Sequence, residues 1–279
     1  MKFWEIIKAI FLGIVEGITE WLPVSSTGHM IVFDEFVKLD VSDAFKEMFF
    51  VVIQLGAILA VPVLFFDKLN PFSKKKSEAE RKTTLSLWGK VIVGALPAAI
   101  IGFLLDDFFD MYFYNYIVVS FALVLYGIAF ILIERKNRGK SYRIENVETL
   151  TYKDALVIGS FQVLSLIPGT SRSGSTIIGG MLTGVSRSAA AEFSFFMAIP
   201  IMLGASGLKI LKFIIGGFTA TGAEIGLLLI GIVVSFLVSL GAIKFLMDFV
   251  KKHSFSPFGV YRIVLGVFVL AFFLIRNAL

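Results

Sequence analysis

The chain has no cysteine in its 279 residues, so disulfide bonds and thiolate metal sites are excluded. Histidine is scarce, with two residues, and charged side chains make up only 17% of the sequence. A nucleotide-binding glycine loop, a zinc-binding pattern and a Ser-His-Asp order are also missing. The common motifs of soluble metalloenzymes and nucleotide-dependent enzymes therefore give no lead to the function.

Apolar residues are abundant instead. They form 57% of the chain, which contains 30 phenylalanines and has a mean hydropathy of +0.87, more than a soluble domain can bury. Three stretches contain no charged residue, namely 48–66, 111–133 and 225–243. At about 1.5 Å per residue, each reaches about 30 Å as a helix, the thickness of the hydrocarbon core of a bilayer. The sequence predicts an all-α polytopic membrane protein.

The net charge of +5 raises the question of a nucleic-acid partner. The lysines and arginines, however, lie in short connections between apolar segments rather than along one face or one arm. That distribution is typical of residues that set membrane orientation. We expect a bilayer and a lipid as partners and no nucleic acid.

Apolar runs and helix breakers predict ten helical segments. They are 2–21, 25–37, 43–66, 84–105, 112–134, 151–167, 171–185, 187–211, 222–247 and 258–277. Four of them form two pairs that are too short or too polar to span: the uncharged run 21–33 reaches only about 20 Å. We interpret 2–37 and 151–185 as re-entrant hairpins, whose irregular turns are tolerated at membrane depth only where protein or water surrounds them. Six full spans remain.

The two hairpins resemble each other at an offset of 146 residues. The offset aligns Gly13 with Gly159, Glu16 with Gln162, Ser25 with Ser171, Thr27 with Ser173 and Gly28 with Gly174. Each hairpin precedes three spans, and an odd number of crossings inverts the second half. The predicted organisation is one membrane domain, 1–279, with a first inverted repeat at 1–134, a linker at 135–150 and a second repeat at 151–279.

This layout places the loops 67–83, 134–153, 186–188 and 248–257 on one side of the membrane, and the first two are strongly basic. The opposite side receives acidic residues such as Asp40, Asp43 and Glu47. By the positive-inside rule the basic side, with the linker, is cytoplasmic and both termini lie outside.

Glu16 and Glu20 share one face of a half-helix, because they are four residues apart. A charged side chain at mid-membrane costs about 2.5 to 3.5 kcal/mol on the insertion scale. Two roles are open: a structural ion pair with a buried cation, or a site role in metal binding, proton transfer or orientation.

Two polar turns carry the remaining chemistry. The sequence Pro-Val-Ser-Ser-Thr-Gly-His at 23–29 can cap a helix, but a half-helix start inside the membrane is also an anion site. His29 lies within reach of Ser25 and Ser26, either as a base or as a hydrogen-bonded core residue. The sequence Pro-Gly-Thr-Ser-Arg-Ser-Gly-Ser-Thr at 168–176 adds a guanidinium among hydroxyls, the outline of a phosphate cradle.

The sequences at 16–29, EGITEWLPVSSTGH, and 168–176, PGTSRSGST, resemble the signatures of the bacterial undecaprenyl-pyrophosphate phosphatase family linked to bacitracin resistance. The resemblance implies removal of the terminal phosphate from undecaprenyl pyrophosphate, which recycles the lipid carrier for cell-wall polymers. It also implies a divalent cation, Mg²⁺ or Ca²⁺, a bacterial plasma membrane location and a site reached from the outer side.

The implied residues fall into three groups. Ser26, His29, Glu20, Glu16 and Arg172 are expected to be catalytic. Ser25, Thr27, Ser171, Arg172, Ser173 and Thr176 are expected to bind the pyrophosphate. Glu16 and Glu20 are the candidates for holding the metal. Ser26 is the preferred nucleophile with His29 or Glu20 as its base, and His29 and water are the rival nucleophiles.

Two other classes of protein stay open at the level of sequence. Inverted repeats with broken helices are also a transporter layout, so a transporter or flippase for a phosphorylated lipid or anion is the alternative. A scaffolding membrane protein leaves the many polar groups within apolar segments unexplained. A homodimer is also left open.

Overall fold

The computed structural model describes residues 2–278, without the side chains of Asp106 and Asp110. Within this range the elements are helices, apart from one isolated bridge between Ile144 and Val185. The α-helices are α1 (Phe3–Thr19), α2 (Ser26–Phe36), α3 (Asp43–Val52), α4 (Gln54–Leu64), α5 (Phe66–Leu69), α6 (Glu78–Phe113), α7 (Tyr116–Asn137), α8 (Tyr152–Gln162), α9 (Arg172–Leu182), α10 (Arg187–Ile215), α11 (Gly222–Lys252) and α12 (Ser256–Ala278), and the 3₁₀ turns are η1 (Val147–Thr149) and η2 (Val163–Leu166).

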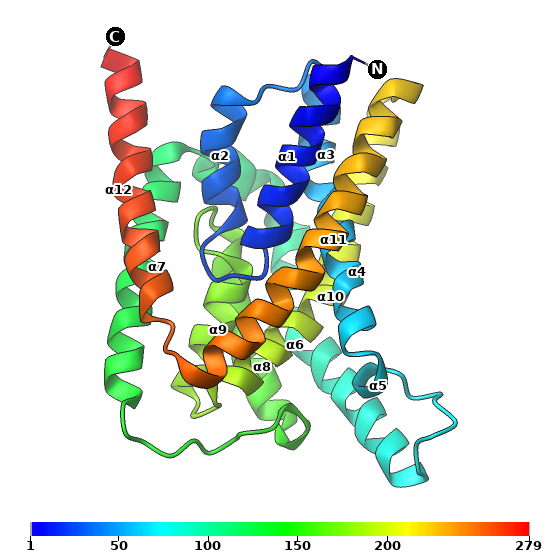
Figure 1. Cartoon of the computed structure of the whole chain (residues 1–279), viewed down its shortest axis with the longest axis vertical. Helices are drawn as coiled ribbons and strands as arrows, with labels where there is room; N and C mark the ends of the chain where they lie inside the picture. The colour runs from blue at the N-terminus through cyan, green and yellow to red at the C-terminus, as the bar shows by residue number, and fades with distance from the viewer. Residues whose placement is uncertain (1, 279) are drawn as a thin grey trace.

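Six helical units are long and apolar enough to cross a bilayer, which confirms the predicted number of spans. They are Asp43–Leu64, Glu78–Leu105, Tyr116–Asn137, Arg187–Ile215, Gly222–Lys252 and Ser256–Ala278. Both termini lie at one end of the molecule, and α5 and the connection between α7 and α8 lie at the other (Figure 1).

Three predicted segments illustrate how the helix boundaries differ from the prediction. The helix expected at 84–105 begins at Glu78, because Ser77 and Glu80 form a reciprocal capping box. It continues past Leu105, where the chain kinks, to Phe113, and the rings of Phe109 and Phe113 pack one helical turn apart at 5.5 Å. The segment expected at 151–167 leaves the α-helix at Gln162, whose carbonyl accepts from the Ser165 hydroxyl at 2.6 Å. The span expected at 43–66 is divided at Ile53 into α3 and α4.

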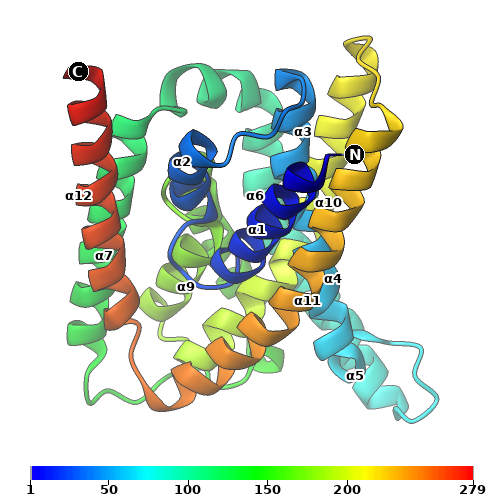
Figure 2. The same cartoon turned by 45° about the horizontal axis from the view of Figure 1, so that its top comes forward.

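Neither short pair of helices crosses the molecule. α1 and α2 descend from the end that holds the termini and return to it, whereas α8 and α9 rise from the opposite end (Figures 1 and 2). The second helix of each pair follows a serine with left-handed backbone, Ser25 at φ 74° and Ser171 at φ 73°. Each serine hydroxyl accepts from the N–H three residues on. These features are those expected of inverted counterparts, and the division into two repeats stays a prediction.

The connection between α7 and α8 is held against the second hairpin. The backbone N–H groups of Arg143 and Ile144 donate to the Gly184 carbonyl, and that of Ser186 donates to Ile144. Beside it, Glu134 at the end of α7 is buried and receives a bidentate bond from Arg187 of α10. The same carboxylate accepts from the Phe255 N–H between α11 and α12 at 2.7 Å. Hydrogen bonds and an ion pair therefore connect several elements at this end of the molecule.

Glycines allow two helix pairs to touch through their backbones, as small residues do in membranes. A Cβ on Gly159 of α8 would lie 1.9 Å from the Gly94 carbonyl oxygen of α6. A Cβ on Gly56 of α4 would lie 2.0 Å from the Ile232 carbonyl oxygen of α11. Any larger residue at these two positions must push the helices apart.

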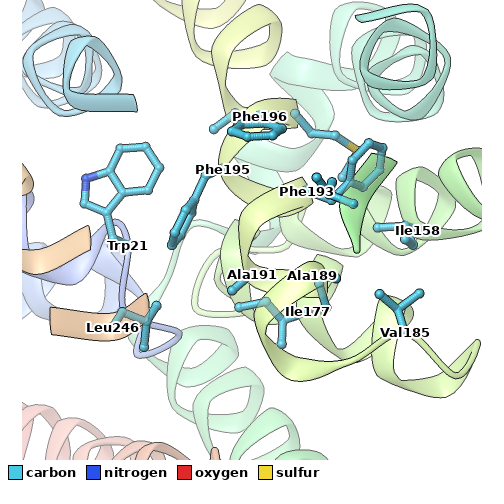
Figure 3. Close-up of a cluster of buried hydrophobic side chains, with 14 of the residues drawn as sticks. Trp21, Ile158, Ile177, Val185, Ala189, Ala191, Phe193, Phe195, Phe196 and Leu246 are labelled. Atoms are coloured by element: carbon cyan, nitrogen blue, oxygen red, sulfur yellow. The ribbon is translucent and has the colours of Figure 1, made fainter. Parts of the chain in front are cut away.

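An aromatic core lies beside the two hairpins (Figure 3). Trp21, just after α1, is fully buried and packs edge-on against Phe195 of α10 at 5.1 Å. Ile177 of α9 and Phe196 of α10 belong to the same cluster of buried residues. The core thus packs two elements against α10: the turn between α1 and α2, and α9.

The closest backbone contact gives a testable prediction. Gly159→Ala should lower the stability of the detergent-solubilised protein by about 1 to 3 kcal/mol, the usual cost of overpacking, as measured by thermal unfolding. Gly207→Ala is the matched control, because a Cβ there meets nothing within 4 Å. It should leave the unfolding temperature unchanged or slightly raised. Equal effects of the two substitutions would show that the α6–α8 contact is not tight.

Candidate active site

The two polar turns, although 146 residues apart in the sequence when Ser25 is aligned with Ser171, meet inside the molecule. We call residues 20–25 the first turn and residues 167–171 the second turn. Arg172, which begins α9, donates through Nη2 to Glu20 Oε1 at 2.9 Å. Ser173 donates to the Glu20 backbone carbonyl at 3.2 Å. Both partners of the ion pair are nearly buried, with 10% and 6% of their side chains exposed. The turns therefore form one site.

Glu20 is the centre of this site. Its second oxygen, Oε2, accepts a hydrogen bond of 2.9 Å from the Ser26 hydroxyl at the start of α2. A carboxylate that accepts from a serine is placed to receive its proton, and the guanidinium on the other oxygen fixes its orientation. Ser26, Glu20 and Arg172 thus form a continuous chain of contacts across the two turns.

Glu16 lies one helical turn before Glu20 on α1 and is buried, with 1% exposed. Its Oε1 atom has no hydrogen-bond partner among the described residues. Burying such an oxygen is costly unless a proton, water or cation satisfies it. The Glu16 Oε1 atom is therefore available to a ligand next to Glu20.

The His29 ring is held on both sides. Nδ1 lies 2.7 Å from the Ser25 carbonyl oxygen, and Nε2 lies 2.7 Å from the Tyr261 hydroxyl. Because a carbonyl only accepts, Nδ1 carries the hydrogen and Nε2 accepts from Tyr261. The two rings are stacked with centroids 5.6 Å apart. In this arrangement Glu20, and not His29, is the base in contact with Ser26.

The hydroxyls at the end of the second turn and in the first part of α9 bond mainly to protein groups. Ser171 caps α9 and lies 3.3 Å from the Ser173 hydroxyl. Thr176 is fully buried and donates to Ser194 of α10 at 2.7 Å. Ser194 also accepts from Arg172 Nη1, through its carbonyl at 2.8 Å and its hydroxyl at 3.1 Å. Ser194 therefore holds the Arg172 guanidinium in place, and Thr176 holds Ser194.

Two predicted ligand groups differ in how they are used. Ser25 is buried and occupied as the cap of α2. Thr27, by contrast, is half-buried, and none of the hydrogen bonds in the described part of the chain involves its side chain. Arg172 Nε is also without a partner among the described residues. Thr27 and the Arg172 Nε are thus the free donors of the site.

Sequence reasoning missed four residues that contact this site. Ser194 and Trp21 hold Arg172, the latter with the guanidinium 5.5 Å from the centre of its ring. Tyr261 and Arg262 come from α12, and Arg262 is fully buried. A signal was present for Arg262, since an arginine within the apolar segment 258–277 indicates a functional position.

The carboxylates of the site offer few ligands to a divalent cation. Among the described residues no group of three or more His, Asp or Glu side chains could hold a metal. Glu16 does offer an unpartnered oxygen, and Glu20 lies one turn away with the Ser26 hydroxyl on it. Mg²⁺ commonly binds through one or two carboxylates plus substrate phosphates and water. The pair therefore fits a cation whose other ligands come from a phosphate and water.

Comparison with known proteins adds an independent finding. The family model "Bacitracin resistance protein BacA" matches residues 9–268. The chain belongs to the BacA family. Proteins named undecaprenyl-diphosphatase from Desulfitobacterium hafniense and Streptococcus mutans are 57% and 55% identical to it, each over 99% of both chains. One of that name from Enterococcus faecalis strain V583 is 56% identical over 98% of this chain and 99% of its own.

The two glutamates should differ in their effect on stability. Glu20→Ala leaves the buried Arg172 without its carboxylate and should destabilise the protein by about 3 to 5 kcal/mol. Glu16→Gln keeps the side-chain volume and breaks none of the ion pairs of the site, so it should be neutral or stabilising. Thermal unfolding in detergent at neutral pH measures both. A loss for Glu16→Gln as large as that for Glu20→Ala would contradict the assigned pairing.

Proposed function

We propose that the chain hydrolyses undecaprenyl diphosphate to undecaprenyl phosphate and inorganic phosphate, and so recycles the lipid carrier for cell-wall polymers. The family and the names of the relatives support this activity. One observation carries it: the Ser26 hydroxyl donates to Glu20, and Glu20 is held by Arg172. Ser26 as nucleophile, Glu20 as base and the Arg172 guanidinium as phosphate-binding group thus lie in one buried site at two helix N-termini.

In the proposed reaction Ser26 Oγ attacks the terminal phosphorus of the diphosphate while its proton passes to Glu20. The bond from that phosphorus to the bridging oxygen breaks, and undecaprenyl phosphate leaves with the electron pair. Water then attacks the phosphoserine, which releases inorganic phosphate and returns the serine. Before this second step Glu20 passes the proton that it took from Ser26 to the leaving undecaprenyl phosphate. It can then accept a proton from the attacking water and deliver it to Ser26 Oγ as the phosphorus–oxygen bond of the phosphoserine breaks.

Arg172 neutralises the charge that builds on the transferred phosphoryl group, as cations do in phosphoryl transfer. Two of its nitrogens are engaged by Glu20 and Ser194, and its Nε is free for a phosphate oxygen. Thr27 follows Ser26 directly, and its hydroxyl is free to bind a phosphate oxygen. Ser25, Ser171 and Ser173 hold the starts of α2 and α9, whose first backbone N–H groups are further donors.

The charges of the site support a divalent cation, Mg²⁺ or Ca²⁺, on Glu16 and Glu20. Arg172 is paired with Glu20, so Arg262 is the one arginine of the site without a carboxylate partner. A diphosphate ester adds roughly two to three negative charges, more than this single arginine balances. A bound cation would supply that balance and polarise a phosphoryl oxygen.

Two rival roles are less well supported by the geometry. His29 as nucleophile would have to give up its hydrogen bond to Tyr261 before its Nε2 could attack. A transporter or flippase needs an anion site but no activated hydroxyl, and so leaves the contact between Ser26 and Glu20 unexplained.

The proposed orientation places the basic loops 67–83 and 134–153 in the cytoplasm of a bacterium and opens the site to the outer side of the plasma membrane. The arrangement of elements supports it, because both basic loops lie at the end opposite the termini (Figure 1). The expectation of a homodimer stays a prediction, to be checked by cross-linking in native membranes.

The activity is tested by phosphate release from a long-chain prenyl diphosphate by the purified protein. Ser26→Ala should lower the rate by about 10³-fold or more, because nucleophile and proton donor are lost together. His29→Ala should lower it less, by about tenfold, through the loosened first turn. Ser160→Ala is the control, since this exposed serine bonds only within α8. A chelator should abolish wild-type release, and Mg²⁺ should restore it.

Three outcomes would overturn parts of this proposal. Absence of phosphate release by the wild type would refute the activity and favour a transporter. A trapped phosphoenzyme with phosphate on His29, or on neither residue, would remove Ser26 as nucleophile. Release that is insensitive to chelator would remove the cation.

Orientation is tested by single cysteines, which need no prior removal of native ones because the chain has none. A cysteine at Lys75 should react with an impermeant maleimide only from the cytoplasmic side. A cysteine at Asp43, an exposed position near the opposite end, should react only from outside. Labelling of position 75 from outside in intact cells would reverse the proposed topology.

A further inference from the structure

Arg262 of α12 joins the two turns through their backbones. Its guanidinium is fully buried. Nη1 donates to the Pro23 carbonyl of the first turn at 3.2 Å. Nη2 donates to the Gly169 and Thr170 carbonyls of the second turn at 2.8 and 2.9 Å. One side chain from a third element therefore fixes how far apart the two turns lie.

The environment of this cation is unusual because it contains no counter-charge. None of the ion pairs within the described part of the chain involves Arg262, and its acceptors are three neutral carbonyls. The ring of Tyr126 also lies near it, with its centre 5.8 Å from Cζ. A buried charge without an acidic partner is normally strongly unfavourable.

Two helix N-termini add to the same positive field. α2 begins at Ser26 and α9 at Arg172, directly after the two turns that Arg262 contacts. A Cβ on Gly174, in the first turn of α9, would lie 3.5 Å from Arg262 Nη1, so the guanidinium is close to that N-terminus. The dipoles of both helices favour an anion, not a cation, at these ends. An anion bound between the turns would relieve this arrangement.

We propose that Arg262 is a positioning residue of the site, which sets the separation of the two turns and provides an uncompensated positive charge behind the bound diphosphate. This inference rests on the proposed phosphatase activity and adds to it a residue outside both sequence motifs. Arg262 acts through the carbonyls of Pro23, Gly169 and Thr170 and makes no direct step in the reaction.

Geometry and charge have separable effects, because a guanidinium and an ammonium differ in shape. The planar fork of arginine reaches three carbonyls from two turns, whereas lysine is a point charge on a flexible stem. Arg262→Lys keeps the charge and loses the forked hydrogen bonding that connects the two turns. Arg262→Met keeps the approximate volume and loses both. Arg276, on the same helix, is about half exposed and paired with Glu35, so Arg276→Lys and Arg276→Met are matched controls.

The experiment measures kcat and KM for a prenyl diphosphate, the inhibition constant of inorganic pyrophosphate and the monodisperse fraction in detergent for all five proteins. For Arg262→Lys we expect kcat to fall by about 100-fold, the cost of a misplaced site, with pyrophosphate inhibition changed less than about threefold. For Arg262→Met we expect the same loss of kcat and a rise in the inhibition constant of about tenfold to 100-fold. The Arg276 variants should match the wild type.

Each other outcome counts against the proposal in a distinct way. If the folded part of both Arg262 variants has wild-type kcat and pyrophosphate inhibition, Arg262 is merely structural and the inference is wrong. If pyrophosphate inhibition is the same for lysine and methionine, the charge has no role behind the diphosphate. If the wild type releases no phosphate, the proposed function fails, and the inference fails with it. Wild-type activity with unaffected Arg262 variants refutes the inference alone.

Discussion

The bond between Glu20 and Arg172 determines how the rest of the site is arranged. It is 2.9 Å long, nearly buried, and connects a turn at residue 20 with a helix that begins at residue 172. Apolar packing alone holds helices together without fixing which polar groups face each other. Leaving either charge of this pair without its partner would be strongly unfavourable, so the pair favours the observed alignment of the two hairpins. The contact of Ser26 with Glu20 then follows from that alignment.

Neighbouring residues hold the guanidinium of this ion pair in place. Ser194 and Trp21 hold the guanidinium, and Thr176 holds Ser194. The aromatic core around Phe195 holds Trp21 in turn. Residues that bind the reacting group must be kept within fractions of an ångström, and a rigid surrounding shell is the usual means. Several hydroxyls that look like ligands in the sequence therefore belong to this supporting shell.

Much of the fold could be predicted from the sequence because lipid imposes strict rules on it. Charge-free runs gave the spans, and their interruption by Glu16, Glu20 and Arg172 gave the hairpins. The similarity of the two turns indicated that they are counterparts, and the structure shows that they meet. Helix ends were less predictable, since the start of α6 depends on a capping box at Ser77 in a polar stretch.

The contacts of α12 and α10 could not be derived from the sequence. Arg262 binds main-chain carbonyls, which every residue possesses, so no pattern in the sequence identifies its partners. Ser194 lies in a run of small and aromatic residues that is typical of helix packing. The direction of Thr176, toward Ser194, depends on how α9 is rotated against α10. Such features follow from three-dimensional packing and not from spacing along the chain.

The polar network at the end opposite the termini has a mechanical consequence. Glu134 joins α7, α10 and the connection between α11 and α12, and the segment around Ile144 is bonded to the base of the second hairpin. A rocking motion of one half against the other, as in alternating access, would have to break the bidentate bond of Arg187 and expose a buried carboxylate. These contacts hold the two halves together at the end away from the termini. Binding and release of the lipid head group are therefore expected without a rocking motion of the halves.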